Sequence, residues 1–240
     1  MSAAPFVELR NISKYFAKVI ANQDVSMQIR KGEVLALLGE NGAGKSTIMK
    51  VLYGLYRAEE GQILVDGAEQ VINSPKDAMK LGIAMIQQHF ALVQAHTVTE
   101  NIILGLVQGK YDIKQYDKIV ADLAARYGFD IDPTAVIGDL PVGVQQKVEI
   151  LKALYQNAQL LIMDEPTAVL TPQESDVLMN FVQQTTRAGK TVVFITHKLR
   201  EVMEVADRIV VMRNGKVVGD LRKDETNEIE LSKLDRKSVV

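Results

Sequence analysis

The sequence predicts an α/β protein whose core is a largely parallel β-sheet covered by helices. The first observation is an alternation of apolar, strand-length segments with helical patterns, in the order 160–163, 172–188, 191–195, 199–206 and 208–212. The second is an earlier apolar segment, 33–38, which reads as a buried strand and is followed by a helical pattern at 47–53. Alternating strands and helices of this kind imply parallel strands with both sheet faces covered.

Shorter strands are predicted in the first third of the chain. Residues 6–9 and 25–29 alternate apolar with polar side chains, as half-buried strands do. Residues 62–67 read as a strand that ends in a turn at Asp66-Gly67. A fourth apolar segment, 83–86, follows the end of a helix and predicts a further strand.

The middle of the chain is predicted to be mainly helical. Helical spacing of apolar residues extends from about residue 99 to 156, interrupted by a loop at 128–142 that carries Pro133 and Pro141. The last segment, 221–240, is dense in charge and predicts a solvated helix on the surface. We find no internal repeat and no low-complexity linker.

Composition limits the possible functions. With 240 residues and 47% hydrophobic residues, we expect one domain, or one domain with a subdomain. A net charge of −2 gives no electrostatic footprint for nucleic acid, and the lack of cysteine excludes disulfides and thiolate metal sites. There is no apolar stretch of the ~20 residues that cross a bilayer and no signal-peptide core at the amino terminus. We therefore expect a soluble, cytoplasmic protein whose role at a membrane would require a partner.

A phosphate-binding loop stands between the strand at 33–38 and the helix that follows it. The segment fits G-x-x-x-x-G-K-[ST], in which glycines let successive N–H groups point at a phosphate. The lysine adds a charge for the terminal phosphates, the serine hydroxyl can ligate Mg²⁺, and the next helix, expected from Ser46, directs its dipole at the same anion. We predict that a nucleoside triphosphate binds here, on Gly39, Glu40, Asn41, Gly42, Ala43, Gly44, Lys45, Ser46 and Thr47.

Two carboxylates follow the apolar segment at 160–163. In an open α/β sheet the carboxyl end of a strand is where ligands bind, so Asp164 and Glu165 are expected beside the phosphate loop. Asp164 can hold Mg²⁺ through water, and Glu165 is placed to polarise a water that attacks the γ-phosphate. The alternative is that both acids only cap the turn that follows them.

Further motifs lie in a fixed order around these two. A glycine-containing segment, 140–146, precedes the carboxylates, with Asp164 lying 21 residues after Gly143. Gln88 follows the strand at 83–86, and His197 follows the strand at 191–195. Phe16, with Tyr15 beside it, lies upstream of the phosphate loop. This set of six motifs resembles the nucleotide-binding domain of an ATP-binding cassette (ABC) transporter, from residue 6 to about 221.

The resemblance implies a fold and roles for these residues. The expected fold is a P-loop NTPase, RecA-like core with an amino-terminal antiparallel β subdomain and an inserted helical subdomain at about 94–157, in one ABC ATPase domain spanning 1–240 with a charged tail at 221–240. Phe16 would stack on adenine, Gln88 would contact Mg²⁺ and the membrane partner, and His197 would contact the γ-phosphate. The catalytic set is then Glu165, His197 and Lys45, and the Mg²⁺ set is Ser46, Gln88 and Asp164. The signature residues that would contact ATP on an opposing domain are Val142, Gly143 and Gln145, with a helix beginning near Gln145.

The resemblance also implies partners. ATP bound to one domain would be closed over by the signature of a second nucleotide-binding domain, in a homodimer or with a different partner. Membrane permease subunits would hold the protein on the inner face of the cell membrane, and a substrate-binding lipoprotein would act indirectly. Nucleic acid is not an expected partner.

The chain departs from the family at two places and resembles one branch of it. Pro141 replaces the usual signature serine, and the segment 168–171 ends in Thr171 where many members have aspartate. Both departures, with the other motifs, resemble importers of simple sugars and nucleosides, whose members usually carry two such domains in tandem. The segment 88–90 favours nucleoside importers of the lipoprotein-dependent type, and riboflavin-like cargo fits equally. The alternatives are a translation-associated ABC ATPase and a slowly hydrolysing regulatory domain. We interpret His89, His96, Asp130 and Asp132 as structural or loop residues.

Overall fold

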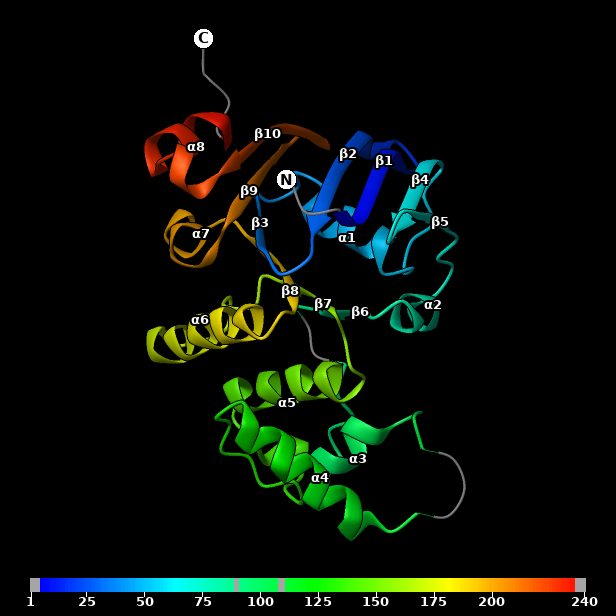
Figure 1. The fold of residues 1–240 in the computed structure, drawn as a ribbon, viewed down its shortest axis with the longest axis vertical. Helices are drawn as coiled ribbons and strands as arrows, with labels where there is room; N and C mark the ends of the chain where they lie inside the picture. The colour runs from blue at the N-terminus through cyan, green and yellow to red at the C-terminus, as the bar shows by residue number, and fades with distance from the viewer. Residues whose placement is uncertain (1–4, 89–90, 108–110, 236–240) are drawn as a thin grey trace.

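The chain folds around two β-sheets and a helical lobe (Figure 1), in a computed structural model that describes residues 5–88, 91–107 and 111–235. The amino-terminal sheet has the order β2-β1-β4-β5, formed by β1 (Pro5–Phe16), β2 (Val19–Arg30), β4 (Glu60–Val65) and β5 (Ala68–Gln70). The core sheet has the order β10-β9-β3-β8-β7-β6, formed by β3 (Val34–Leu38), β6 (Ile83–Ile86), β7 (Leu160–Asp164), β8 (Thr191–Thr196), β9 (Arg208–Arg213) and β10 (Lys216–Arg222). The predicted α/β class, with a mostly parallel core sheet and an antiparallel amino-terminal sheet, is confirmed.

The core sheet brings strand ends that are distant in sequence to one edge. Strand β3 pairs in parallel with β8 and β9, and β7 pairs in parallel with β6 and β8, whereas β10 is antiparallel to β9. All five residues of β3 are buried, with Leu35 and Leu37 facing one apolar cluster and Ala36 and Leu38 facing another. The carboxyl ends of β3, β7 and β8 therefore meet at the same edge, with helix α1 (Lys45–Leu52) directly after β3.

The amino-terminal sheet has longer strands than the pattern predicted. We expected strands at 6–9 and 25–29, but β1 and β2 have 12 residues each and form one antiparallel hairpin. Register shifts interrupt the alternation near Asn11 and Asp24, which both have positive φ and are joined by a hydrogen bond of 2.5 Å. The pattern therefore showed only the regular ends of each strand. The predicted turn at Asp66-Gly67 is present, with φ of 49° and 80°, values suited to a tight hairpin.

A helical lobe forms the green part of the ribbon at one end of the molecule (Figure 1). It contains α3 (Val98–Ile103), α4 (Ile113–Arg126), a short 3₁₀ turn (Ile137–Asp139) and α5 (Val142–Tyr155). Apolar side chains of α3, α4 and α5 share one cluster with Leu178 and Phe181 of α6 (Pro172–Arg187). Helix α5 therefore links the lobe to the core.

The remaining helices cover the core sheet and its edge. They are α2 (Pro75–Lys80), α7 (Leu199–Val205) and α8 (Glu228–Asp235). We expected 221–240 to be a solvated surface helix, and its described part is so only in part: the helix α8 is present with Leu231 as its buried residue, but it begins at Glu228. Leu221 belongs to β10, and Leu231 of α8 is fully buried in a cluster with Val202 and Ile209. The sequence did not predict this contact, because Leu231 stands among charged and polar residues and forms no periodic apolar pattern.

None of the helices in the described part of the chain is both long enough and apolar enough to span a bilayer.

Candidate active site

The phosphate loop is held from outside by neighbouring strands and turns. Gly42 and Gly44 have φ of 85° and 96°, a region that side chains rarely adopt. The Gly44 carbonyl accepts a hydrogen bond of 3.1 Å from Nδ2 of the buried Asn22, and a Cβ at Gly44 would overlap Asn22 and the Ala21 carbonyl. The Gly215 N–H donates to the Ala43 carbonyl at 3.0 Å. The loop conformation is therefore fixed before any ligand binds.

Lys45 lies inside this loop. Its Nζ donates to the carbonyl oxygens of Gly39 at 2.5 Å and Glu40 at 3.0 Å, and only 5% of the residue is exposed. Burial lowers the pKa of Lys45, and attraction to Glu165 and Asp164 opposes that shift. Among the described residues Lys45 forms no ion pair, so its buried charge favours an incoming anion.

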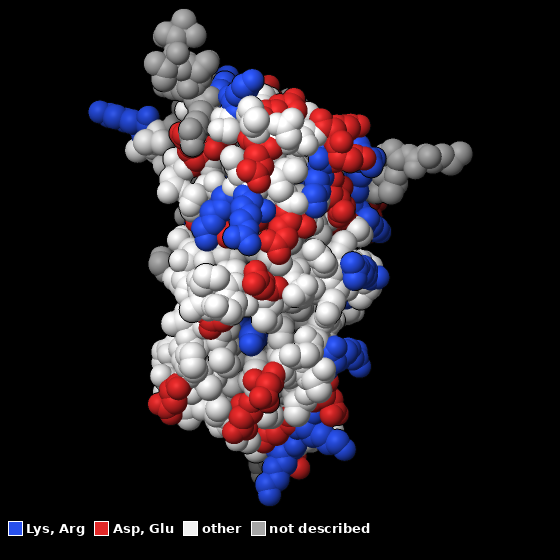
Figure 2. Space-filling view, turned by 90° about the vertical axis from the view of Figure 1, so that its left-hand side faces the viewer, with Lys and Arg blue, Asp and Glu red and all other residues white. Residues whose placement is uncertain are grey.

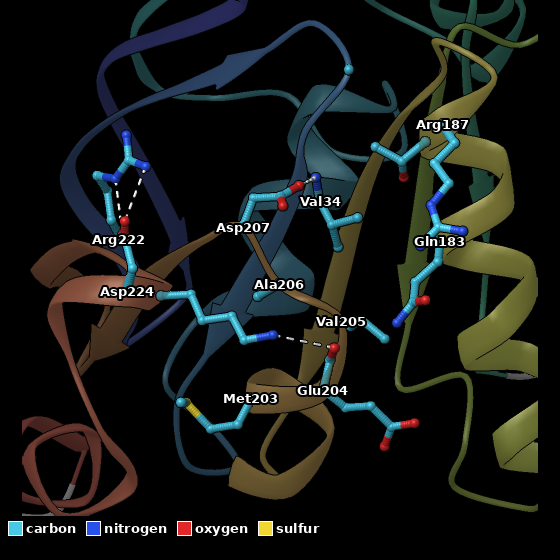
Figure 3. A pocket seen from close by; sticks show the side chains of 13 residues that line it. Val34, Gln183, Arg187, Met203, Glu204, Val205, Ala206, Asp207, Arg222 and Asp224 are labelled. Atoms are coloured by element: carbon cyan, nitrogen blue, oxygen red, sulfur yellow. Dashed lines mark hydrogen bonds and ion pairs between the residues drawn. The ribbon is translucent and has the colours of Figure 1, made fainter.

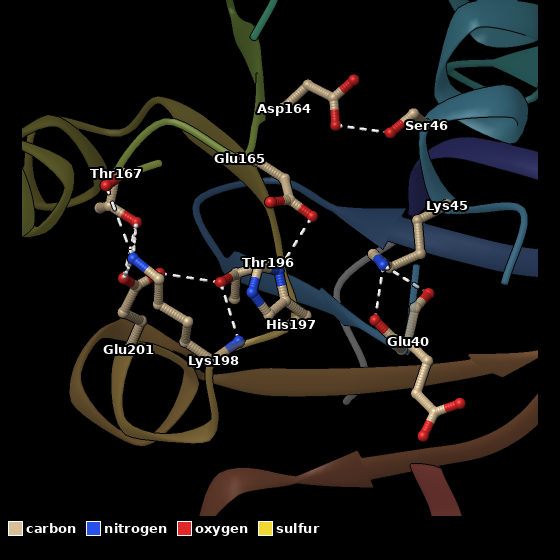
Figure 4. Close-up of polar contacts among 11 residues, drawn as sticks. Glu40, Lys45, Ser46, Asp164, Glu165, Thr167, Thr196, His197, Lys198 and Glu201 are labelled. Carbon is tan, nitrogen blue, oxygen red and sulfur yellow. Dashed lines mark hydrogen bonds and ion pairs between the residues drawn. The ribbon is translucent and has the colours of Figure 1, made fainter. Parts of the chain in front are cut away.

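Asp164 and Ser46 join the end of β7 to the first turn of α1. The Ser46 hydroxyl donates to Oδ1 of Asp164 at 2.6 Å (Figure 4), and Asp164 is only 4% exposed. Burial raises the pKa of this carboxyl, and the hydrogen bond from Ser46 works against that rise. A buried carboxylate and a hydroxyl therefore lie beside the phosphate loop.

Glu165 and His197 meet at the ends of two adjacent strands. Nδ1 of His197 lies 3.1 Å from Oε1 of Glu165, and the Glu165 N–H donates to the Ile195 carbonyl at 3.0 Å. Glu165 has φ of 48°, an unfavourable value for a residue with a side chain. Such local strain is typical of functional sites, where the surrounding structure imposes it.

A cavity of about 310 Å³ brings most of the predicted residues together. It is lined by Asn41, Gly42, Ala43, Gly44, Lys45, Ser46, Thr47, Gln88 and Glu165. Gln88, from the segment after β6, thus lines the same cavity as the phosphate loop. Gly39 and Glu40 contribute the carbonyls that hold Lys45.

The predicted adenine and signature residues lie elsewhere and do not line this cavity. Phe16 is 39% exposed at the end of β1, with its ring 5.1 Å from that of Tyr56 in an edge-to-face arrangement. The signature residues Val142, Gly143 and Gln145 lie at the start of α5, and Nε2 of Gln145 donates to the Leu140 carbonyl at 2.9 Å.

The signature helix also begins earlier than expected. We predicted a start near Gln145, but α5 begins at Val142 with Pro141 in the cap position. The fixed φ of proline suits a helix entrance, where a missing N–H costs little. Glu174 of α6 lies against Gly143, close enough that a Cβ there would overlap its carboxyl group.

The other residues that we interpreted as structural or loop residues are mostly described. Asp132 accepts hydrogen bonds from the N–H and hydroxyl of Thr134, as expected of a loop aspartate. The His96 N–H donates to the Val93 carbonyl, and Asp130 is exposed. His89 and Phe90, on which the nucleoside interpretation of 88–90 depends, lie outside the described residues.

Sequence reasoning missed a second layer of side chains behind the site. The Glu201 carboxylate accepts hydrogen bonds from the hydroxyls of Thr167 and Thr196 (Figure 4), and Asn22 supports the phosphate loop. These contacts join residues that are 5 to 34 positions apart and form no motif. The sequence offered one indication of this layer: Thr167 and Thr196 stand within two residues of Glu165 and His197.

A larger cavity, of about 780 Å³, lies at the opposite edge of the core sheet (Figure 3). It includes Val34, whose N–H donates to Asp207 at 2.8 Å, and an Arg222–Asp224 ion pair of 3.0 Å. No residue that the sequence predicted for the site lines it. On the face shown in Figure 2, basic and acidic side chains are interspersed rather than gathered by sign.

Proteins similar to this chain include ATP-binding proteins of importers. The family model described as ABC transporter matches residues 22–168. The nucleoside import ATP-binding protein NupA of Lactococcus lactis subsp. cremoris is 46% identical over 98% of this chain and 47% of its own length. The guanosine import ATP-binding protein NupO of Bacillus subtilis is 50% identical over 95% of this chain and 45% of its own length. The chain thus spans about half the length of the curated relatives it matches.

Solved structures share the fold. The ADP conformation of MJ1267, an ATP-binding cassette of an ABC transporter, superposes with a TM-score of 0.83 at 26% identity, covering 96% of this chain and 94% of the other. The matched family model covers the phosphate loop, Asp164 beside it and Glu165 of the cavity. The chain belongs to the ABC transporter family and has the fold of its nucleotide-binding cassette.

Proposed function

We propose that this chain is the ATP-binding and ATP-hydrolysing part of an importer for a nucleoside, a simple sugar or a similar small solute. The observation that carries this proposal is the placement of Glu165, with His197 in contact, in the cavity of a preformed phosphate loop. The names of NupA and NupO, which refer to nucleoside and guanosine import, support the transport role and favour nucleosides as cargo.

Lys45 and the loop N–H groups would bind the triphosphate. The ammonium now donates to two loop carbonyls, and it can transfer these hydrogen bonds to phosphate oxygens without leaving the cavity. The positive φ values of Gly42 and Gly44 orient the loop backbone, and α1 adds the positive end of its dipole. Phe16, exposed beside Tyr56, offers an aromatic face for adenine.

The oxygen groups around Asp164 fit Mg²⁺. Asp164, Ser46 and Gln88 supply a carboxylate, a hydroxyl and an amide, and Mg²⁺ prefers few protein oxygens together with water and phosphate. When bound, Mg²⁺ neutralises charge on the phosphate oxygens.

Glu165 would accept the proton of the attacking water. Its contact with Nδ1 of His197 orients the carboxylate, and the imidazole donates this hydrogen bond when Nδ1 carries the proton. Glu165 and His197 directly follow β7 and β8, which pair in the core sheet, so their backbones are held near each other.

The signature residues would act on a second nucleotide-binding domain. Val142 is 46% exposed, and neither it nor Gly143 or Gln145 lines the phosphate cavity of their own chain. We propose that they close over the ATP of a homodimeric, tandem or different partner domain. Permease subunits would couple this closure to transport on the inner face of the membrane, with a substrate-binding lipoprotein delivering the cargo.

Titration calorimetry with Mg-ATP tests the binding step of this proposal. Lys45→Ala should weaken ATP binding by about 100-fold or more, because a charge-assisted contact to phosphate is lost. Lys80→Ala removes an exposed charge on α2 and should leave the affinity unchanged. Equal affinities for wild type and Lys45→Ala, or an absence of ATP binding in wild type, would overturn the proposal.

A further inference from the structure

A buried carboxylate stands directly behind the Glu165–His197 pair. Glu201, on α7, is 9% exposed. Its Oε1 accepts a hydrogen bond of 2.6 Å from the Thr167 hydroxyl and forms an ion pair of 2.9 Å with Nζ of Lys198. Its Oε2 accepts a hydrogen bond of 2.8 Å from the Thr196 hydroxyl (Figure 4). These three contacts are made by side chains that lie within two residues of Glu165 or His197 in the sequence.

These contacts connect the two loops that carry the reactive pair. Thr167 stands two residues after Glu165, in the loop that follows β7, and Thr196 immediately precedes His197 at the end of β8. Both threonines are buried. One carboxylate on a third element, α7, therefore spans the two segments whose separation sets the 3.1 Å contact between Glu165 and His197.

The network requires an acceptor that cannot donate. The Lys198 N–H donates to Oγ1 of Thr196 at 3.1 Å, and Lys198 Nζ donates to Oγ1 of Thr167 at 3.1 Å. Each threonine hydroxyl already accepts one hydrogen bond, and its own proton is directed to Glu201. An ionised carboxylate accepts both protons, whereas a glutamine amide has one acceptor oxygen and a donating NH₂.

We propose that Glu201 is a positioning residue that holds Glu165 and His197 in hydrogen-bonding register. Glu201 does not line the phosphate cavity, so it acts through the two threonines and through Lys198, the residue after His197. The catalytic consequence rests on the proposed ATPase function, but the geometric consequence does not, so the two can be tested separately.

The geometric test is the tautomer of His197. The chain has three histidines, so two-bond ¹H–¹⁵N spectra at about pH 8, where ordinary imidazoles are neutral, can be assigned with a His197→Ala variant. We expect the Nδ1–H form in wild type, because Nδ1 faces the Glu165 carboxylate. In Glu201→Gln we expect at least half of this signal to move to the Nε2–H form.

The control is Glu204→Gln, which changes an exposed carboxylate on the same helix and should keep the wild-type spectrum. Thr196→Val, which removes one hydroxyl at constant shape, should shift the tautomer partly and keeps the test available if Glu201→Gln does not fold. An unchanged tautomer in folded Glu201→Gln or Thr196→Val, or an Nε2–H form in wild type, would overturn the proposal.

The catalytic test is a double-mutant cycle on single-turnover ATP hydrolysis. We expect Glu201→Gln to slow hydrolysis about tenfold through misplacement of the pair, while the dissociation constant for ATP stays within about twofold. Added to His197→Ala, it should cost little more, since both changes remove the same contact. Full additivity would overturn the positioning role, whereas a wild type that never hydrolyses ATP would contradict the proposed function and leave the tautomer result standing.

Discussion

The phosphate-loop edge of the core sheet and the signature end of α5 differ in how complete they are. At the first, Lys45, Asp164 and the Glu165–His197 pair all have partners within 3.1 Å, and the lysine and Asp164 are buried. At the second, Val142 is exposed and Gly143 lies against Glu174, a residue of α6 rather than of the phosphate site. The first region is organised before a ligand binds, whereas Val142 of the second is exposed to solvent.

This difference follows from what each region does with charge. Burial lowers the pKa of Lys45 and raises that of Asp164, because it disfavours the charged form of each group. A ligand of opposite charge would offset this cost at the phosphate-loop edge. The signature residues Val142, Gly143 and Gln145 have no ionisable side chain. Substitutions should therefore affect binding and stability at the first region and assembly at the second.

The largest effect is expected for Glu165→Gln. Removal of the proton acceptor should lower phosphate release by about 100-fold or more, while the affinity for ATP stays within about twofold of wild type because Lys45 is untouched. A malachite-green assay and titration calorimetry measure the two quantities. Substantial turnover by this variant would mean that another group accepts the proton.

Two glycine substitutions compare the regions directly. Gly44→Ala places a Cβ against backbone at φ of 96° and should lower the free energy of unfolding by about 2 kcal/mol or more. At Gly143 the three atoms nearest to an added Cβ all belong to the Glu174 side chain, which can move if its hydrogen bonds to Thr171 are lost, so we expect a smaller loss of about 1 kcal/mol for Gly143→Ala. Urea unfolding followed by circular dichroism measures the free energy of unfolding of both variants. Equal losses would contradict the difference that we expect between the two regions.

Asp164→Asn should stabilise the nucleotide-free chain. Because burial raises the folded-state pKa of Asp164 above its ordinary value of 3.8, folding is favoured by protonation and stability falls as pH rises through that raised pKa. At neutral pH the buried, ionised carboxylate lowers the free energy of unfolding. Asparagine removes this charge, so the Tm should rise by about 2–4 °C. The gain should narrow as pH falls toward 3.8. A lower Tm at neutral pH would contradict this account.

The smallest effect is expected for Thr171→Asp, which restores the residue common in the family. Thr171 caps α6 in a reciprocal pair with Glu174, and aspartate caps helices equally well. The free energy of unfolding should change by less than about 0.5 kcal/mol, with Thr171→Ala costing about 1 kcal/mol as the control. A large loss with aspartate would show that repulsion from Glu174 dominates.

The sequence was most informative where local chemistry is decisive. The phosphate loop, the strand that ends at Asp164 and the strand before His197 were predicted because glycine spacing and apolar runs determine them locally. The burial of Leu231 was missed, because one apolar side chain among charges gives no periodic signal.

Contacts between distant segments were also not predictable. The bond from Asn22 to Gly44 and the hydrogen bonds of Glu201 depend on which strands become neighbours in the sheet. Helix α5 began at Val142 because Pro141 serves as its cap, a local effect that the resemblance to the usual signature obscured.

The central claim is that the signature end of one copy, where Val142 is exposed, completes the phosphate site of a second copy. Light scattering on Glu165→Gln, with and without Mg-ATP, tests it most directly, since a variant that binds but does not hydrolyse ATP should remain closed. We predict the mass of one chain without nucleotide and of two chains with Mg-ATP, and a return to one chain when Gly143→Asp is added. A mass of one chain at saturating Mg-ATP, with binding shown by calorimetry, would contradict closure of this chain on a copy of itself.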